Sequence, residues 1–340
     1  MKLSWKQYDL HLKHTFRISR SARDIAPVIV LTLEHDGIIA YGEASPTKRY
    51  GEDLDTIATF FRSLDLSRFE SPFQLEEILA YVDAKAPGNT SAKCAVDLAL
   101  HDWVGKKLGV PLYKLWGLEK SKAAQCSFTI AIDSKEVVKQ KVLEAEEYPI
   151  LKVKVGLDND KEMIETIRSV TDKVLYVDAN EGWKDRMIAL EWIKYLKDQN
   201  VEFVEQPMPA DQFDDLCWLR DKSDLPIIAD ESVLRLSEVP RLAQAFDGIN
   251  IKLMKCTGVR EAMRMINTAR ALKMKVMMGV MIRFVTMLPR FSFMVWPCCL
   301  DHSSMNPVMV SMRSRSIRMN LGSFSASIAF VSVKNTFAFF

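Results

Sequence analysis

Short apolar runs recur at regular spacing through the middle of this chain, and most of them close on a charged residue. The runs begin near residues 126, 151, 174, 202, 226, 249 and 275, a repeat of 23 to 28 residues. Runs this apolar are typical of parallel strands buried on both faces. The amphipathic segments between them have helical length; examples are 159–171, 184–198, 211–222 and 258–273. The pattern predicts an α/β fold with a TIM-like barrel of seven or eight βα units, and a doubly wound open sheet is the weaker alternative.

The first third of the chain has a different pattern. The runs 28–35 and 38–44 are rich in β-formers and are joined around Asp36-Gly37, a strong hairpin signal. Residues 53–85 are predicted to be helical, and a second helix is expected over 92–107, with possible caps at 89–91 and an end at Gly109. His101 within it is expected to be a hydrogen-bonded structural residue. We therefore predict an α+β domain over residues 1–118 and a barrel over 119–282.

The pattern breaks after Ile282. Residues 283–340 contain no Glu, one Asp, one Lys and ten Ser, with Pro289 and Pro297 interrupting the apolar stretches. No eighth βα unit is visible there. The abrupt change favours a shift of reading frame near codon 282, and a genuine variant tail is the alternative.

Composition excludes several functions. The net charge is +2 with no sustained basic run, so no nucleic-acid partner is expected. The N-terminus lacks an apolar signal core, and no stretch approaches 18 uninterrupted apolar residues, so no membrane association is expected. The six cysteines form no CxxC pair, which predicts reduced thiols and a cytoplasmic protein. A homo-oligomer is compatible with the sequence.

Lys152 and Lys154 lie two residues apart in an apolar run, so a strand would place both side chains on one face. Two lysines on a buried strand destabilise it unless they have charge partners. Crowding of two ammonium groups lowers the pKa of at least one of them, which suits a base. An exposed edge strand is the structural alternative.

Asp178, Glu205 and Asp230 close three successive runs. Adjacent parallel strands lie about 4.8 Å apart, so three carboxylates at their ends can converge on one ion. Oxygen ligands select a hard cation, here Mg²⁺ in preference to Ca²⁺. Asn180 and Glu231 flank the set and could orient the ligands. The structural alternative is three unrelated acids in solvent-exposed loops.

Lys252 closes the sixth run, across the barrel mouth from Lys152 and Lys154. Bases on opposite faces of one carbon can remove a proton from one side and return it from the other, which inverts a stereocentre. Lys255, three residues later, is expected to lie in the following loop.

The segments KVKVG, VDANEGW, VEQP, ADES and NIKLMKCTG, together with ALHDWVGKKLGVPLYKLWG at 99–117, resemble the muconate-lactonizing subgroup of the enolase superfamily. The dipeptide epimerases, the group of L-Ala-D/L-Glu epimerase, are the branch most similar to residues 1–282. The resemblance implies one Mg²⁺ held by Asp178, Glu205 and Asp230, acid/base catalysis by Lys154 and Lys252, and electrostatic stabilisation by Lys152. It also implies that the N-terminal domain caps the site, and that substrate is contacted by Thr129, by Tyr50, and by the loop from Arg17 to Arg23.

The tail departs from that family. An acidic residue after GVMI and an Asp-x-Asp segment on strand eight are expected, but Arg283 and Phe284 follow GVMI, and Asp301 is the one acid available as a substrate-ammonium ligand. The function implied is an isomerase: Mg²⁺-dependent 1,1-proton transfer beside a carboxylate, as in epimerisation of a dipeptide. The alternatives are a cycloisomerase, an o-succinylbenzoate synthase, an N-acylamino-acid racemase, or a non-catalytic product of a damaged gene.

Overall fold

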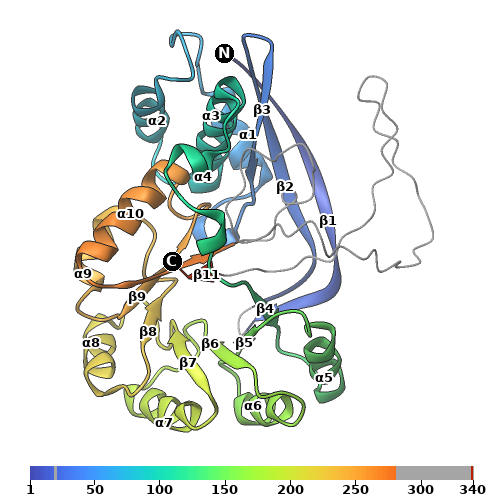
Figure 1. The fold of residues 1–340 in the computed structure, drawn as a ribbon, viewed down its shortest axis with the longest axis vertical. Coiled ribbons are helices and arrows are strands. Elements are labelled where there is room, and N and C mark those ends of the chain that lie inside the picture. Colours follow the sequence, from blue (N-terminus) through green and yellow to red (C-terminus); the bar gives the residue numbers. More distant parts are fainter. Residues whose placement is uncertain (19–20, 281–337, 340) are drawn as a thin grey trace, which may run out of the picture.

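The computed structural model describes residues 1–18, 21–280 and 338–339. These residues form an N-terminal unit of antiparallel strands and helices above a curled parallel sheet that helices cover on its outer side (Figure 1). The predicted α/β class, with a barrel-like sheet and an α+β cap, is confirmed.

The cap is built on a three-stranded antiparallel sheet in the order β1-β2-β3. Its strands are β1 (Lys2–Ile18), β2 (Ser21–His35) and β3 (Ile38–Ala44). The turn between β2 and β3 has Asp36 at φ 50° and Gly37 at φ 70°. Two successive residues with positive φ favour the Asp-Gly pair, so the predicted hairpin is confirmed.

Four helices complete the cap: α1 (Leu54–Arg62), α2 (Leu75–Ala84), α3 (Thr90–Leu108) and α4 (Leu112–Leu115). The prediction of helix throughout 53–85 is wrong for 63–74, which contains Pro72 and links α1 to α2. Gly109 ends α3 with φ 66°, as predicted. Asn89 makes no capping hydrogen bond; instead the Glu52 carboxylate accepts hydrogen bonds from the Ser91 amide at 3.1 Å and from the Ser91 hydroxyl.

The second unit contains seven parallel strands in sequence order. They are β4 (Ser127–Ile130), β5 (Ile150–Lys154), β6 (Val174–Asp178), β7 (Val201–Glu205), β8 (Ile227–Ala229), β9 (Gly248–Lys252) and β10 (Lys275–Gly279). The outer helices are α5 (Lys135–Glu144), α6 (Asp160–Arg168), α7 (Arg186–Lys197), α8 (Phe213–Lys222), α9 (Val239–Leu242) and α10 (Val259–Ala271). Short 3₁₀ turns are η1 (Lys48–Tyr50), η2 (Lys120–Lys122) and η3 (Leu236–Glu238), and β11 (Ala338–Phe339) pairs antiparallel with β10. The seven predicted strand positions are confirmed.

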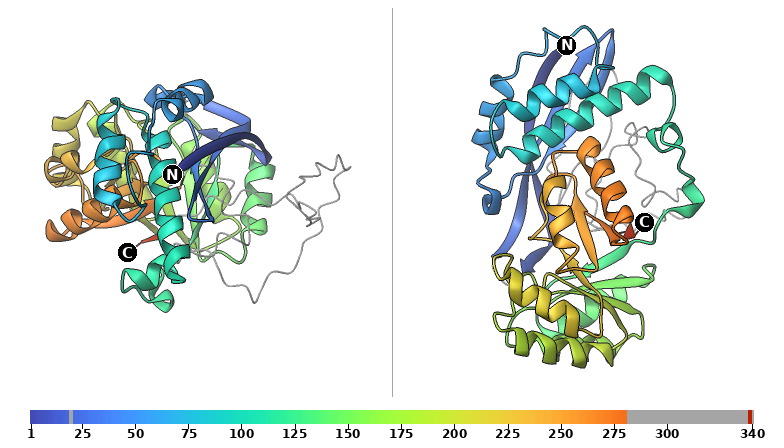
Figure 2. Two further views of the ribbon diagram at one scale, coloured as in Figure 1. Left: turned by 90° about the horizontal axis from the view of Figure 1, so that it is seen from above. Right: turned by 90° about the vertical axis from the view of Figure 1, so that its left-hand side faces the viewer.

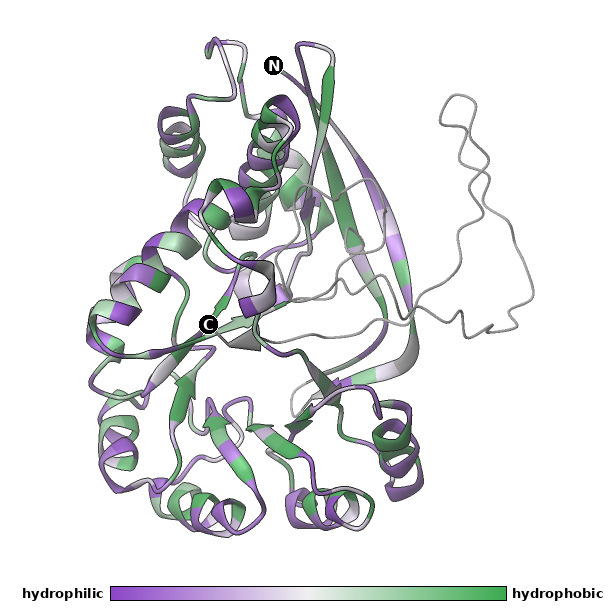
Figure 3. Cartoon of the chain, in the orientation of Figure 1, coloured by the Kyte–Doolittle hydropathy of each residue, from purple (hydrophilic) through white to green (hydrophobic). Residues whose placement is uncertain are grey.

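Alternation along the strands separates two faces of the sheet. Leu151 and Val153 face outward into the main core, which the strands share with the helices; Figure 3 shows the strands as largely hydrophobic and the helices as mixed. Ile150 faces inward and packs in a small cluster with Tyr176, Phe203, Ile228 and Met277.

The inward face is therefore apolar at one end of the strands. The next inward positions toward the C-terminal ends are occupied by charged or polar residues, namely Lys152, Lys154, Asp178, Glu205, Asp230, Asn250 and Lys252. Strand periodicity thus directs all of them to one mouth of the sheet.

The cap lies over this mouth. The long β1–β2 ribbon bends down beside the sheet as far as β4 and α5, and α3 packs against α10 (Figures 1 and 2). Within the described residues, no helix is long and apolar enough to cross a bilayer.

Candidate active site

Three carboxylates meet at the mouth of the sheet. In the strand register, Lys154 of β5 lies beside Asp178 of β6, which lies beside Glu205 of β7; Asp230 follows β8 directly. Each of the three acids offers an oxygen within 4.8 Å of the others, and all three are buried. Their convergence agrees with the sequence prediction, and the alternative of separate solvent-exposed acids is wrong.

The lysines of β5 bind this acidic group from one side. Lys152 Nζ lies 2.7 Å from Asp178 Oδ2 and 2.6 Å from Glu205 Oε2. Lys154 Nζ lies 2.6 Å from the same Asp178 oxygen and donates to Asn180 Oδ1 at 3.0 Å. Both lysines are buried, so the alternative of an exposed edge strand is wrong.

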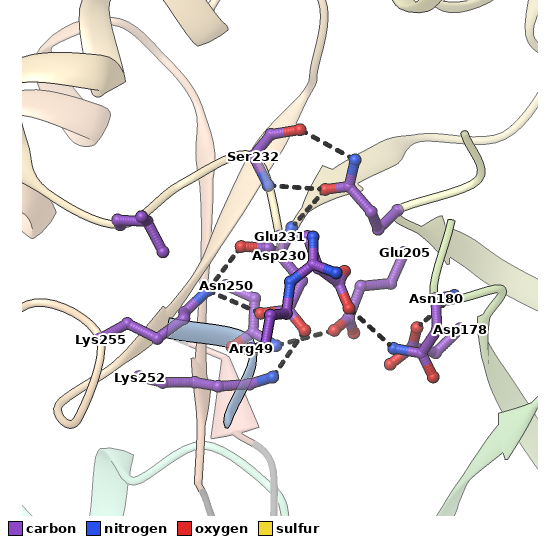
Figure 4. A network of polar contacts seen from close by, with 12 residues as sticks. Arg49, Asp178, Asn180, Glu205, Asp230, Glu231, Ser232, Asn250, Lys252 and Lys255 are labelled. Atoms are coloured by element: carbon purple, nitrogen blue, oxygen red, sulfur yellow. Dashed lines mark hydrogen bonds and ion pairs between the residues drawn. The ribbon is translucent and has the colours of Figure 1, made fainter. Parts of the chain in front are cut away.

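Two further lysines bind from the β9 side, as Figure 4 shows. Lys252 Nζ lies 2.5 Å from Asp230 Oδ2, and Lys255 Nζ lies 2.6 Å from Asp230 Oδ1. Asn250, two residues before Lys252 on the same face of β9, donates to Glu205 Oε1 at 2.9 Å. The acidic group therefore has cationic partners on two opposite sides.

The backbone beyond the ligands adopts a conformation that L-residues rarely take. Asn180, Glu181 and Gln206 have φ values of 47°, 65° and 37°. Such residues cluster at functional sites, where the surrounding structure holds them in place. The turn after β6 directs the Asn180 side-chain amide between Lys154 and Glu231. It accepts from Lys154 and donates to Glu231 Oε1 at 3.2 Å.

Crowding and burial shift the pKa values of the acids in different directions. Burial, together with the charges of Asp178 and Asp230, raises the pKa of Glu205 from 4.5 to about 8. Burial opposes ionisation of Asp178 and Asp230 too, but their lysine partners outweigh it and hold the pKa of both carboxyls well below 3.8.

The lysines on the two sides also differ. Burial and the neighbouring Lys152 lower the pKa of Lys154, although Asp178 opposes the shift. Burial acts in the same direction on Lys252, but Asp230 and Glu205 outweigh it and raise the pKa of Lys252. The pKa values of Lys154 and Lys252 are thus shifted in opposite directions.

The cap contributes residues above the mouth. Burial, followed by the charge of Asp230, raises the pKa of Tyr50 in η1. Its neighbour Arg49 forms an ion pair of 2.8 Å with Glu181 of the barrel. On the other side, the charge of Arg17 on β1 acts on Asp133, which follows β4. Tyr50 lies in η1 and Arg17 in β1, both in the cap, and their contact with substrate stays a prediction.

Thr129 lies beside Lys152 in the register of β4 and β5. Its hydroxyl oxygen is buried and has no hydrogen-bond partner among the described residues. Asp301, the other predicted substrate contact, lies outside the described residues.

Three polar residues of the site were not identified from the sequence. Lys255 does lie in the turn after β9, as expected, but it is buried and bound to Asp230. Gln206 accepts hydrogen bonds from the amides of Asp230 and Ser232 at 3.0 and 3.1 Å. The third is Asn250. Its position inside an apolar run, two residues before Lys252, is the signal that could have identified it.

The donor set fits a hard divalent cation. It consists of three carboxylates with no sulfur or imidazole ligand, and few protein ligands leave positions for water and substrate, as Mg²⁺ requires. The lysines around the three carboxylates offset their buried negative charge.

Comparison with known proteins gives the same family from both parts of the chain. Residues 6–117 match the family described as mandelate racemase / muconate lactonizing enzyme, N-terminal domain. Residues 135–305 match the family described as enolase C-terminal domain-like.

Individual relatives are similar over most of their length. An L-Ala-D/L-Glu epimerase of Bacteroides thetaiotaomicron is 51% identical over 282 residues, which cover 83% of this chain and 74% of the relative. The structure of a dipeptide epimerase from Cytophaga hutchinsonii, complexed with Mg and D-Ala-L-Val, superposes with a TM-score of 0.79 at 28% identity, covering 87% of this chain and 84% of the other.

The structure of an N-succinyl Arg/Lys racemase from Bacillus cereus has a TM-score of 0.77 at 30% identity, covering 83% and 81%. Sequence motifs, fold and site geometry agree with these matches. The chain therefore belongs to the mandelate racemase / muconate lactonizing enzyme family of the enolase superfamily.

Proposed function

We propose that this protein is a Mg²⁺-dependent isomerase that epimerises a dipeptide, such as L-Ala-D/L-Glu, at the α-carbon of its C-terminal residue. The observation that carries the proposal is the arrangement of Asp178, Glu205 and Asp230 between lysines of β5 on one side and of β9 on the other. The similarity to relatives named as dipeptide epimerases extends over most of their length, and it supports the choice of substrate class.

Asp178, Glu205 and Asp230 would hold the ion. When bound, a divalent cation supplies charge stabilisation at the substrate carboxylate as the adjacent carbon loses its proton. Lys152, fully buried and bound to two of these carboxylates, would add a fixed positive charge beside the reacting carboxylate. Asn180 and Glu231 would orient Lys154 and the ligands from the turn after β6 and the end of β8.

Lys154 and Lys252 would be the acid/base pair. The amine of one lysine takes the α-proton: the C–H bond breaks, its electron pair is delocalised toward the substrate carboxylate, and a new N–H bond forms. The ammonium of the opposite lysine then delivers a proton to the other face of the carbon and becomes an amine. The product is the epimer, and the two lysines have exchanged protonation states.

Specificity would reside in the cap. Thr129, Tyr50 and Arg17 are our candidates for substrate contact, because two of them belong to cap segments above the mouth and the third lies beside Lys152. Asp301 stays a prediction for the substrate ammonium, since it lies outside the described residues. We also propose a division at residues 118/119 between cap and barrel, with 283–340 as an atypical tail; the change from antiparallel to parallel sheet supports the first division.

We also propose that the protein is cytoplasmic, that its cysteines are reduced and that it forms a homo-oligomer. Among the described residues, Cys217 and Cys256 are free thiols. This supports the expectation of a reducing compartment.

The test is proton exchange in D₂O. The purified full chain with Mg²⁺ should incorporate deuterium at the α-carbon of the C-terminal residue of L-Ala-L-Glu and form L-Ala-D-Glu, followed by proton NMR; chelation of the metal should stop both. Exchange on N-succinyl-L-Arg but not on the dipeptide would favour the racemase alternative, which the Bacillus cereus structure supports.

If neither compound exchanges its α-proton, the proposal is contradicted, and the non-catalytic product of a damaged gene is favoured. The nucleotide sequence of codons 280–300 addresses that alternative directly, because a frame that restores an acidic strand eight would identify the shift.

A further inference from the structure

Asp230 lies one residue beyond the hydrogen-bonded ladder of β8. The ladder ends at Ala229, which pairs with Ile249 of β9. Side chains bind both backbone groups of Asp230 instead: its N–H donates to Gln206 Oε1 at 3.0 Å, and its carbonyl accepts from Lys255 Nζ at 2.5 Å. The same carbonyl also accepts the Val233 amide at 3.2 Å. Two buried side chains thus replace the ladder at this position, and Figure 4 shows Lys255 directed at Asp230.

Lys252 and Lys255 share one carboxylate but bind it differently. Lys252 contacts Oδ2 at 2.5 Å, and 13% of its side chain is exposed. Lys255 contacts Oδ1 at 2.6 Å and also the backbone carbonyl of Asp230, and 2% of its side chain is exposed. Lys252 can leave its oxygen for a substrate at the mouth, whereas Lys255 is held by two acceptors of one residue away from solvent.

A tight turn fixes the base of the Lys255 side chain. The amides of Lys255 and Cys256 donate to the carbonyl of Lys252 at 2.8 and 3.1 Å. The turn ends at Gly258, with φ 120°, where a Cβ atom would lie 2.4 Å from Cγ of Asp97 in the cap. The turn is therefore clamped between β9 and α3, and Lys255 cannot follow Lys252 toward the substrate.

We propose that Lys255 is a positioning residue for the metal site. It fixes the Oδ1 atom and the carbonyl of Asp230, so that the carboxylate keeps its place in the group with Asp178 and Glu205 when Lys252 turns to the substrate. This inference rests on the proposed role of Asp230 as a metal ligand. Groups that orient a ligating carboxylate typically contribute about 10- to 100-fold to metal affinity.

The test compares two lysines of the same carboxylate in the full chain. Mg²⁺ binding is measured by calorimetry for the wild type, Lys255→Met and Lys252→Met, with melting curves recorded with and without Mg²⁺. We expect Lys255→Met to bind Mg²⁺ about 10- to 100-fold more weakly, and Lys252→Met to bind it nearly as the wild type does. Lys255→Arg, which keeps charged donors, should recover part of the affinity.

Equal Mg²⁺ affinity in the folded Lys255→Met variant and the wild type would overturn the inference, and so would an equal loss in Lys252→Met. If Lys255→Met does not fold, Lys255→Gln takes its place, because it retains a single neutral donor group; its affinity should fall in the same way, and unchanged affinity would again overturn the role. A wild type that binds no Mg²⁺ refutes the metal site itself, a result distinct from failure of the Lys255 role.

Discussion

Two of the places where this molecule buries carboxylates satisfy them in different ways. At the cap–barrel interface, Asp97 of α3 accepts the amides of Val259 and Arg260, the first residues of α10, at 2.7 and 3.1 Å. At the barrel mouth, Asp178 and its neighbours are bound mainly by lysine side chains and lie within 4.8 Å of one another.

The difference separates a structural acid from a functional set. Asp97 binds donors that cannot leave, because they belong to the backbone at the start of a helix, where negative charge is favourable. The three acids of the mouth crowd like charges in a buried place and depend on lysines that can change partners. Folding alone does not require that arrangement, whereas a metal site with mobile proton carriers does. Substitutions at the mouth should therefore affect function more than stability, and substitutions at the interface the reverse.

The largest effect is expected for the two lysines. Lys154→Ala and Lys252→Ala should each lower the rate of epimerisation by about 10²- to 10⁴-fold, the usual contribution of one acid/base group. Each variant should stay folded, because Asp178 keeps Lys152 and Asp230 keeps Lys255 as partners. Steady-state kinetics and circular dichroism measure both. Ordinary turnover in either variant would show that this lysine is not an acid/base catalyst.

Next comes the metal ligand at the centre. Glu205→Gln should weaken Mg²⁺ binding by more than the roughly 100-fold upper value for an outer-shell partner, because it removes a charged ligand. The melting temperature without metal should change little, since the raised pKa of Glu205, about 8, already favours its protonated form at neutral pH.

Calorimetry and thermal melting test this prediction, with Glu202→Gln as the matched control. Glu202 lies on the same strand, three residues before Glu205, and is exposed. Equal Mg²⁺ affinity in Glu205→Gln and the control would remove Glu205 from the metal site.

The interface should respond in the opposite way. Asp97→Ala leaves two amides of α10 without their acceptor and should reduce the free energy of unfolding by about 1–3 kcal/mol. Asp97→Asn, which keeps one acceptor oxygen, should cost less. Denaturant unfolding measures both; a loss of Mg²⁺ affinity in Asp97→Asn without loss of stability would contradict the division between the two regions.

The smallest effect concerns the histidine beside Asp97. Burial opposes protonation of His101, but the Asp97 carboxylate, 3.1 Å from Nδ1, outweighs it and raises the pKa of His101 above 6.5. A pKa raised in the folded state means that protonation stabilises the fold. This contribution is fully present below pH 6.5 and is lost as the pH rises through the folded-state pKa.

His101→Gln should therefore flatten the decline of the melting temperature above pH 6.5. His11→Gln, at an exposed position of β1, is the control and should leave the profile unchanged. An unaltered profile in His101→Gln would show that the Asp97 pair carries no pH-dependent stability.

Much of the mouth could be predicted from the sequence, because strand geometry is local. Apolar runs that end in Lys154, Asp178 or Glu205 specify both the strand and the edge at which the charge lies. The spacing of Lys152 and Lys154 places both on one face of the strand. In the register of the sheet, Lys152 lies beside Thr129 and Lys154 beside Asp178.

Partner choice could not be predicted in this way. Asp97 and Val259 are 162 residues apart, and which carboxylate Lys255 would bind depends on how the turn after β9 packs. The non-helical link at 63–74 was missed because apolar residues recur at helical spacing on both sides of it, in α1 and α2. The role of the tail stays a prediction, since residues 281–337 are not among those described.

Stereospecific exchange tests the two-base site most directly. Lys154→Ala and Lys252→Ala are each incubated in D₂O with Mg²⁺ and, separately, with the two epimers of the dipeptide, and the α-proton signal is followed by NMR. The account predicts that each variant exchanges the α-proton of one epimer only, and that the two variants select opposite epimers. Loss of exchange with both epimers in one variant, or exchange of both epimers in either, would contradict a site with one lysine on each face of the substrate carbon.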